Sequence, residues 1–268
     1  MLSCAAIRSS AESCLAKGAD FMNLLISGTN AFYGYGGYGY HYMFDWTYLL
    51  VIAGLIISLA ASAKVKSTFA KYSRVRSMCG LTGAEAARKV LELSGIYDVR
   101  IEHVSGNLTD HYDPRSKVLR LSDSTYSSNS VAAVCVAAHE CGHAVQHQLS
   151  YKPLVLRSTL VPAANFGSTL AWPVFLIGLI FSMQPLLTIG IVLFSLAVIF
   201  QLVTLPVEFN ASSRALRILE DGHILGTTEL ESGKKVLSAA AMTYVASLVA
   251  SVLQLLRLLI LARGRDND

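Results

Sequence analysis

Long apolar stretches dominate the pattern of hydrophobic and polar positions along this chain. The longest lies between Arg157 and Glu208, where about 50 consecutive residues include no Asp, Glu, Lys or Arg. Because one membrane crossing takes about 20 apolar residues, this run is long enough for two. Pro185, near its middle, is typical of a hairpin tip. The pattern therefore predicts crossing helices over residues 160–183 and 187–205.

Residues 46–63 form a further uncharged segment, between Asp45 and Lys64. Its first residues, Trp46 and Tyr48, suit an aromatic belt at a membrane interface. This segment is the predicted first crossing.

The last apolar segment covers residues 236–256, where Arg257 interrupts it. Its many Ala and Ser residues suit packing between membrane helices, and they equally suit a helix that lies in the interface. Both interpretations stay open. Charged residues make up 15% of the chain, against about 25% in ordinary soluble domains, which favours a membrane protein.

Basic residues gather beside particular ends of the predicted crossings. They are Lys64, Lys66, Lys71, Arg74 and Arg76 after the first, Lys152 and Arg157 before the second, and Arg214 and Arg217 after the third. Because Lys and Arg beside membrane helices stay preferentially in the cytoplasm, residues 64–157 and 208–235 are expected there. The N terminus is then outside. Arg257 and Arg263 disagree with this rule if the last helix spans the membrane.

Residues 64–151 are the part of the chain that is polar and long enough to form a compact unit outside the membrane. Thr82-Gly83-Ala84-Glu85 has the form of a capping box and predicts a helix that ends near Ser94. Ser127-Ser128-Asn129-Ser130 offers N-cap residues for a second, longer helix. Between the two helices, residues 97–104 and 118–122 alternate as strands do.

The strand-forming part is expected to be a hairpin. Tyr112-Asp113-Pro114-Arg115, between the two predicted strands, has the composition of a turn. The five cysteines are an odd number and include no Cys-x-x-Cys pair, so free thiols are expected; they are Cys4, Cys14, Cys79, Cys135 and Cys141.

The stretch His139-Glu140-Cys141-Gly142-His143 carries the chemistry. On a helix, residues four apart share a face, so His139 and His143 can both bind one zinc ion. Glu140 then lies beside the ion and can act as the general base for the water that zinc activates. The alternative is a helix whose histidines only pack or pair with Glu140, which is costly for buried polar side chains. Cys141 faces away and is expected to pack.

A catalytic zinc usually takes a third protein ligand. His147 is about 12 Å along the helix from His139, which is too far, and is expected to be a solvated residue. Glu208, at the end of the uncharged run, is the better candidate. From position alone it could equally be the first charge past the bilayer. His111, His223 and Arg214 are the candidates for a donor that stabilises the tetrahedral intermediate.

Glu208-Phe209-x-Ala211-x-x-x-Ala215 resembles the third-ligand helix of the membrane metallopeptidases that include the heat-shock protease and the prenyl-protein endopeptidase. That group typically has Asp where this chain has Ser212, which puts in doubt a carboxylate contact to a zinc histidine.

Residues 64–215 show a closer resemblance. With Ser105-Gly106-Asn107-Leu108-Thr109-Asp110-His111-Tyr112-Asp113-Pro114, the zinc motif and residues 205–212, they are similar to the neutral zinc metallopeptidases of bacteria, multi-pass membrane proteins of the YugP type. The similarity extends through the last apolar segment. It implies that His139, His143 and Glu208 bind one Zn²⁺ per chain in a gluzincin-like site.

The expected fold is mainly α: a multi-pass helical membrane protein with a small α+β, zincin-like cytoplasmic domain made of a strand hairpin and the motif helix. The expected parts are a Gly- and Tyr-rich disordered tail (1–44), a first transmembrane helix (45–63), the metallopeptidase domain (64–157), a transmembrane hairpin (158–207), a cytoplasmic segment with the third ligand (208–235) and a transmembrane or interfacial helix (236–262).

The expected function is that of a zinc endopeptidase of the bacterial cell membrane, acting at the cytoplasmic interface. Its expected partners are the lipid bilayer and membrane-associated protein or peptide substrates, bound as an added strand along the hairpin that includes residues 118–122; no nucleic-acid partner is expected. Two alternatives stay open. One is a noncatalytic membrane scaffold with a structural zinc. The other is an intramembrane protease whose motif helix crosses the bilayer, as the uncharged residues 124–138 mildly favour.

Overall fold

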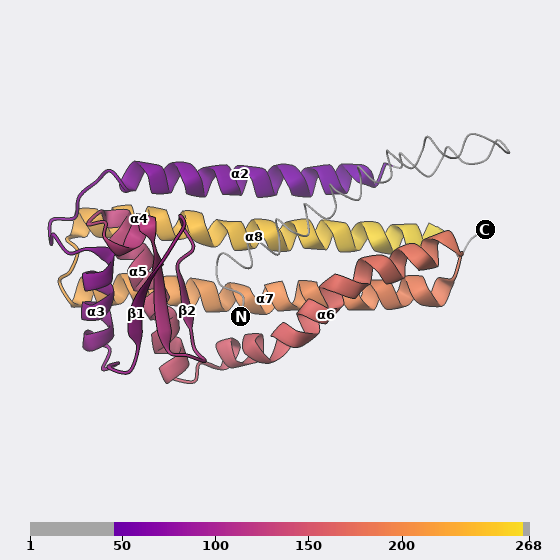
Figure 1. Cartoon of the computed structure of the whole chain (residues 1–268). Helices are drawn as coiled ribbons and strands as arrows, with labels where there is room; N and C mark the ends of the chain where they lie inside the picture. The colour runs from indigo at the N-terminus through magenta and orange to yellow at the C-terminus, as the bar shows by residue number, and fades with distance from the viewer. Residues whose placement is uncertain (1–45, 265–268) are drawn as a thin grey trace.

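Four long helices run side by side through most of residues 46–264, the part of the chain that this computed structural model describes (Figure 1). They are α2 (Tyr48–Tyr72), α6 (Lys152–Ile180), α7 (Gln184–Asp221) and α8 (Thr227–Gly264). α8 packs against both α2 and α7, and α6 packs against α7. All four are long and apolar enough to cross a membrane. The chain is therefore mainly helical, with four candidate membrane helices.

These helices continue beyond the predicted crossings. α2 runs on past Lys64, and α7 runs on past Glu208, each into charged sequence. Pro185 lies in the first turn of α7, where its missing N–H leaves no helical hydrogen bond unmade. The predicted domain boundaries stay predictions, and the predicted tail (1–44) lies outside the described residues.

A compact group of shorter elements gathers at one end of the long helices (Figure 1). It holds α3 (Gly83–Leu93), α4 (Asp123–Tyr126), α5 (Val131–Gln148) and a three-stranded sheet. The predicted capping box is confirmed: the N–H of Glu85 donates to the Thr82 hydroxyl, and the N–H of Thr82 donates to the Glu85 carboxylate. Ser130 caps α5 by accepting from the N–H of Ala133.

The sheet corrects the predicted hairpin. Its strands are β1 (Arg100–Val104), β2 (His111–Asp113) and β3 (Val118–Ser122), in the order β1-β3-β2. β1 pairs with β3 in parallel, and the antiparallel pair is β2 with β3. Tyr112 and Asp113, predicted in the turn, belong to β2. Three residues are too few to show the alternation that identifies a strand, so the pattern revealed only the two longer strands.

α5 is the central helix of this compact end. Its residues before the histidine motif are small or β-branched, and nearly all are fully buried, among them Ala132, Val134 and Cys135. α3, α7, α8 and the sheet pack around it. Within residues 46–264, α5 is not among the helices that could cross a membrane. The motif helix is therefore a buried core helix.

A close approach of α5 to α7 places the two halves of the candidate site together. A Cβ atom on Gly142 would lie 2.6 Å from the backbone oxygen of Ala211. Glu208 precedes Ala211 by three residues, so it lies on the same face of α7 and one turn away. Glycine at position 142 therefore lets the histidine-bearing helix contact the backbone of the helix that carries Glu208.

Gly142→Ala should destabilise the protein. Alanine ordinarily stabilises a helix interior by about 1 kcal/mol relative to glycine, but here its methyl group meets a backbone oxygen, and such overpacking costs about 1–3 kcal/mol. Thermal denaturation of the detergent-solubilised protein should therefore show a lower midpoint. The control is Gly226→Ala, where the added atom meets only Glu229 Oε2 at 3.7 Å. A midpoint for Gly142→Ala at or above that of the control would contradict the close approach.

Candidate metal centre

The two motif histidines lie one turn apart on the same face of α5. Their ring centroids are 4.9 Å apart, and the rings are nearly perpendicular. Both side chains are mostly buried, with 12% of their surface exposed. The i, i+4 spacing thus places His139 and His143 as the sequence predicts.

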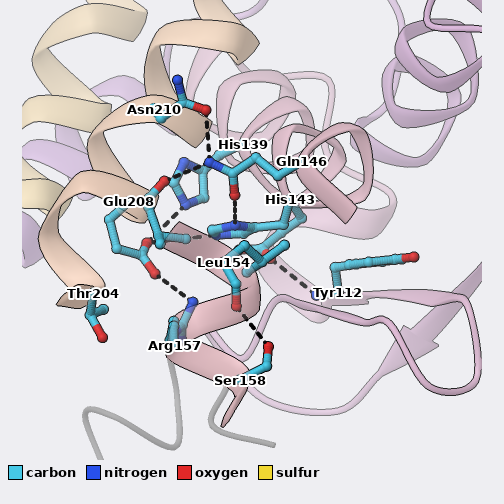
Figure 2. Close-up of polar contacts among 12 residues, drawn as sticks. Tyr112, His139, His143, Gln146, Leu154, Arg157, Ser158, Thr204, Glu208 and Asn210 are labelled. Atoms are coloured by element: carbon cyan, nitrogen blue, oxygen red, sulfur yellow. Dashed lines mark hydrogen bonds and ion pairs between the residues drawn. The ribbon is translucent and has the colours of Figure 1, made fainter. Parts of the chain in front are cut away.

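Glu208 reaches this pair from α7. Its Oε2 atom lies 3.4 Å from His139 Nε2 and 3.7 Å from His143 Nε2 (Figure 2). These distances are longer than the 2.7–3.2 Å of an N–H···O hydrogen bond. Oε2 is buried and has no hydrogen-bond partner within the described residues. A buried carboxylate oxygen without a hydrogen bond is costly, and a cation bound in this space would offset that cost.

The three side chains fit a zinc ion. Their ligand atoms all lie within 4.8 Å of one another. Ligands that sit about 2.0–2.1 Å from a tetrahedrally coordinated zinc are about 3.3 Å from each other, close to the spacing of Glu208 Oε2 and the two Nε2 atoms. Two imidazoles and one carboxylate also leave one tetrahedral position for water, as a catalytic site needs.

Gln146 orients His143. Its amide Nε2 donates to the backbone oxygen of Val207 at 2.8 Å and to Asn210 Oδ1 at 2.9 Å. Because the amide nitrogen is satisfied on α7, Gln146 Oε1 faces His143 Nδ1 at 3.0 Å and accepts its proton. The lone pair of His143 is then on Nε2, toward Glu208. Gln146 therefore fixes the tautomer of a candidate ligand.

Ser212 takes the corresponding position at His139. Its hydroxyl lies 3.1 Å from His139 Nδ1. The related metallopeptidases typically have Asp here, and a hydroxyl makes the contact instead of a carboxylate. A hydroxyl can either donate or accept, so this contact orients the ring without fixing its tautomer.

Glu140 lies beside the candidate ligands, and a hydrogen bond from the sheet holds its carboxylate. Its Oε2 accepts the backbone N–H of Tyr112, on β2, at 3.1 Å. Only 4% of the residue is exposed, and burial raises the pKa of its carboxyl to about 8 from an ordinary 4.5. The side chain lines the cleft described below. It is thus positioned to exchange a proton with a molecule in that cleft.

Arg157 is part of the site, although the sequence marked it only as a basic residue near the membrane. Its Nη1 lies 3.3 Å from Glu208 Oε1, the oxygen that faces away from the histidines (Figure 2). Its side chain is 11% exposed. Arg157 and Glu208 are the two charges that bound the 50-residue uncharged run. That shared position was the available signal that they pair.

A cleft of about 580 Å³ opens beside the candidate metal ligands. Its walls come from the start of α6, from α5 and from β2 with the turn that follows. The lining includes the candidate ligands His143 and Glu208, the candidate base Glu140, and Arg157. The site can therefore admit a molecule far larger than water.

Comparison with known proteins agrees with this site. Residues 47–263 match the protein family described as "Putative neutral zinc metallopeptidase". The chain is also 51% identical over 220 residues to the "Putative membrane protease YugP" of Bacillus subtilis (strain 168), a match that covers 82% of this chain and 98% of that protein. The chain belongs to this family. No solved structure gives a significant match. The YugP-type resemblance is confirmed.

Family membership implies zinc, and the His139, His143 and Glu208 group is where the described residues could hold it. His147 does not join that group. Contrary to the prediction, it is not simply solvated, because its Nδ1 lies 3.0 Å from the hydroxyl of Tyr112 at the cleft wall.

The three residues predicted as donors to the tetrahedral intermediate are arranged differently. Arg214 donates to Asn210 Oδ1 at 2.7 Å, away from the cleft lining, and His223 also lies outside that lining. His111 lines the cleft, but its Nδ1 must donate to the backbone oxygen of Thr109, 2.9 Å away. A neutral His111 therefore offers a lone pair, not a proton, at Nε2.

The motif cysteine packs, as expected. Cys141 is fully buried, and burial raises the pKa of its thiol well above the usual range. Cys79, Cys135 and Cys141 are free thiols. Cys4 and Cys14 lie outside the described residues.

Gln146→Leu should lower zinc affinity by about 10- to 100-fold, the usual effect of losing a contact that orients a ligand. The change keeps the approximate size of the side chain but removes the acceptor for His143 Nδ1. Competition with a chelator of known affinity would measure it. Gln148→Leu is the matched control, because Gln148 is exposed on the same helix two residues later. Equal zinc affinity of the two variants would show that Gln146 does not orient the ligand.

Proposed function

We propose that this protein is a zinc-dependent endopeptidase of the bacterial cell membrane that hydrolyses membrane or juxtamembrane protein substrates. One observation carries the proposal: the buried Oε2 of Glu208, which makes no hydrogen bond within the described residues, lies at metal-ligand spacing from the Nε2 atoms of His139 and His143. The match to the zinc metallopeptidase family supports it.

The catalytic roles follow from the positions of the side chains. When bound, zinc acts as a Lewis acid that polarises a peptide carbonyl and makes water acidic. Glu140 accepts the proton of the attacking water and passes it to the nitrogen of the leaving amine. The N–H of Tyr112 keeps that carboxylate aimed at the cleft. Arg157 binds the outer oxygen of Glu208 and leaves the inner one to the metal.

The active site is proposed to lie on the cytoplasmic side. Basic residues near the predicted crossings gather at the end of the long helices that carries the sheet and α5, which supports this orientation. They include Lys64 and Lys71 at the end of α2, Arg157 early in α6, and Arg217 late in α7. The N terminus of α2 then faces the outside.

α8 is proposed to span the membrane as well. It packs along α2 and α7, which supports a full crossing over an interfacial position. Arg257 is then an exception to the charge rule near the outer end. Its guanidinium lies 4.1 Å from the centre of the Tyr48 ring, and such a contact stabilises a cation by about 1–2 kcal/mol where water is scarce.

Substrate is proposed to bind along β2. β3, which includes residues 118–122, is the central strand and is paired on both sides, so it has no free edge. β2 is an edge strand, and His111, Tyr112, Pro114 and Arg115, on it and on the following turn, line the cleft. An extended peptide can add to such an edge through backbone hydrogen bonds.

The scaffold alternative requires a closed zinc site, because structural sites usually have four protein ligands. The described residues bring together three metal-ligating side chains and no fourth. The intramembrane alternative requires the motif helix to cross the bilayer, and α5 is instead the core of the compact end. Both observations favour the proposed endopeptidase.

Glu140→Gln should retain zinc and lose activity by at least about 100-fold, because it removes the general base but no ligand. Glu208→Ala should lose both activity and zinc. Its zinc affinity should fall by more than the roughly 100-fold expected when only an orienting contact is lost. Metal content by mass spectrometry and cleavage of casein by the detergent-purified protein would measure both.

Glu220→Ala is the control, because Glu220 is exposed on the same helix as Glu208. Full zinc retention by Glu208→Ala would exclude Glu208 as a ligand. Undiminished cleavage by Glu140→Gln would exclude the mechanism.

A further inference from the structure

We infer that this protein cuts its substrates at a short, nearly constant distance from the membrane boundary, and that this distance, more than side-chain identity, selects the cleaved bond. The inference rests on the proposed function, and it holds for either orientation in the membrane. Three features support it: the level of the metal centre, the course of the cleft and the chemistry of its walls.

The ion pair between Arg157 and Glu208 defines the level of the metal centre. It joins the two ends of the uncharged run, which folds as α6 and α7. Both helices therefore leave the apolar region at the same height, and the candidate ligand Glu208 is itself one of the two boundary charges. No loop separates Glu208 from the membrane hairpin, because α7 continues through both.

The length of α7 gives the distance of the metal centre from the membrane boundary. Glu208 follows Gln184, the first residue of α7, by 24 residues, which is about 36 Å at 1.5 Å per residue. A tilt of about 20° shortens the projection to about 34 Å, and the hydrocarbon layer is about 30 Å thick. The tip between the helices includes exposed Phe181 and Met183, which hold it at the far boundary. The metal centre then lies about 4–6 Å beyond the near boundary.

The cleft descends from the metal centre toward the membrane. Its lining extends along α6 to Val161, four residues beyond Arg157 and inside the uncharged run. Its other end is formed by Pro114 and Arg115, after the edge strand β2. A chain that emerges from the bilayer can therefore enter beside Val161, pass the metal ligands and continue along β2.

The membrane-side wall carries no charge beyond Arg157. Ser158, Thr159 and Val161 supply it. The hydroxyls of Ser158 and Thr159 donate to backbone oxygens one turn earlier on α6. An extended chain advances about 3.3 Å per residue, so a depth of about 4–6 Å corresponds to about one or two residues. The substrate residues that pass here meet an uncharged wall whose two hydroxyl protons are already donated to the α6 backbone, so the wall discriminates only weakly between substrate side chains. The position of a peptide bond along the substrate, measured from the membrane, is therefore the main determinant of which bond is cleaved.

A substrate with one transmembrane helix followed by a long, water-soluble repeat of Gly-Ser would test this inference, because such a repeat stays flexible outside the bilayer. Its two kinds of peptide bond recur along the whole repeat, so side-chain identity cannot confine the cuts to one region and only position can. In liposomes that contain the full-length zinc-loaded protein, mass spectrometry should find cuts within about three residues of the helix end. Lengthening the transmembrane helix by four leucines should move the cuts with the new boundary. The same repeat without a helix should be cut at least about tenfold more slowly, because it is not confined beside the site.

Cuts spread along the whole repeat, or equal cleavage of the soluble repeat, would overturn the inference and leave the endopeptidase proposal standing. A second measurement needs no cleavage. In Glu140→Gln, a photoreactive residue two positions past the helix end should crosslink to the cleft, whereas one at the twelfth position should crosslink at least about tenfold less. Cleft crosslinks without cleavage of any substrate by the wild-type protein would contradict the endopeptidase proposal alone. Equal crosslinking from both positions would refute the inference.

Discussion

The whole site depends on one backbone contact, between α5 at Gly142 and α7 at Ala211. Two helices approach this closely only where one of them lacks a side chain, and Gly142 lies between the two halves of the histidine motif. The contact brings a carboxylate more than 60 residues away in sequence to the Nε2 atoms of both imidazoles. It also puts the Gln146 amide against the backbone of Val207. One glycine thus positions both a candidate ligand and the group that orients another.

Burial of Glu208 is the main electrostatic cost of this arrangement. A carboxylate that is 2% exposed is destabilised unless positive charge surrounds it. Arg157 compensates one oxygen, and the described residues offer the other only two imidazoles. A divalent cation bound by those three groups would complete the compensation. The ion pair between Arg157 and Glu208 also explains why the uncharged part of α6 begins at the level where the uncharged part of α7 ends. The charges at these two boundaries are each other's partners.

Much of this arrangement could be predicted from the sequence, because local patterns encode it. The capping box at Thr82, the i, i+4 histidines and the isolated carboxylate Glu208 are all visible in short windows. β2 was missed because three residues carry no periodicity, and the parallel pairing of β1 with β3 depends on a crossover that no local pattern records. Arg157 and Gln146 were missed for a related reason: each acts through a contact between segments about 50 or more residues apart, and that contact becomes visible only after folding.

The two histidines are held differently, and the difference follows from the chemistry of their partners. Gln146 presents an oxygen that can only accept, because its nitrogen is already committed to α7. Ser212 presents a hydroxyl that can turn either way. The neutral ring of His143 therefore presents its lone pair at Nε2, where it can bind a cation, whereas His139 must still select that tautomer. Glu208 supplies the selection, since a cation attracted to its free oxygen favours an Nε2 lone pair on both rings. The carboxylate is thus the residue on which the order of the site finally depends, and the membrane hairpin carries it.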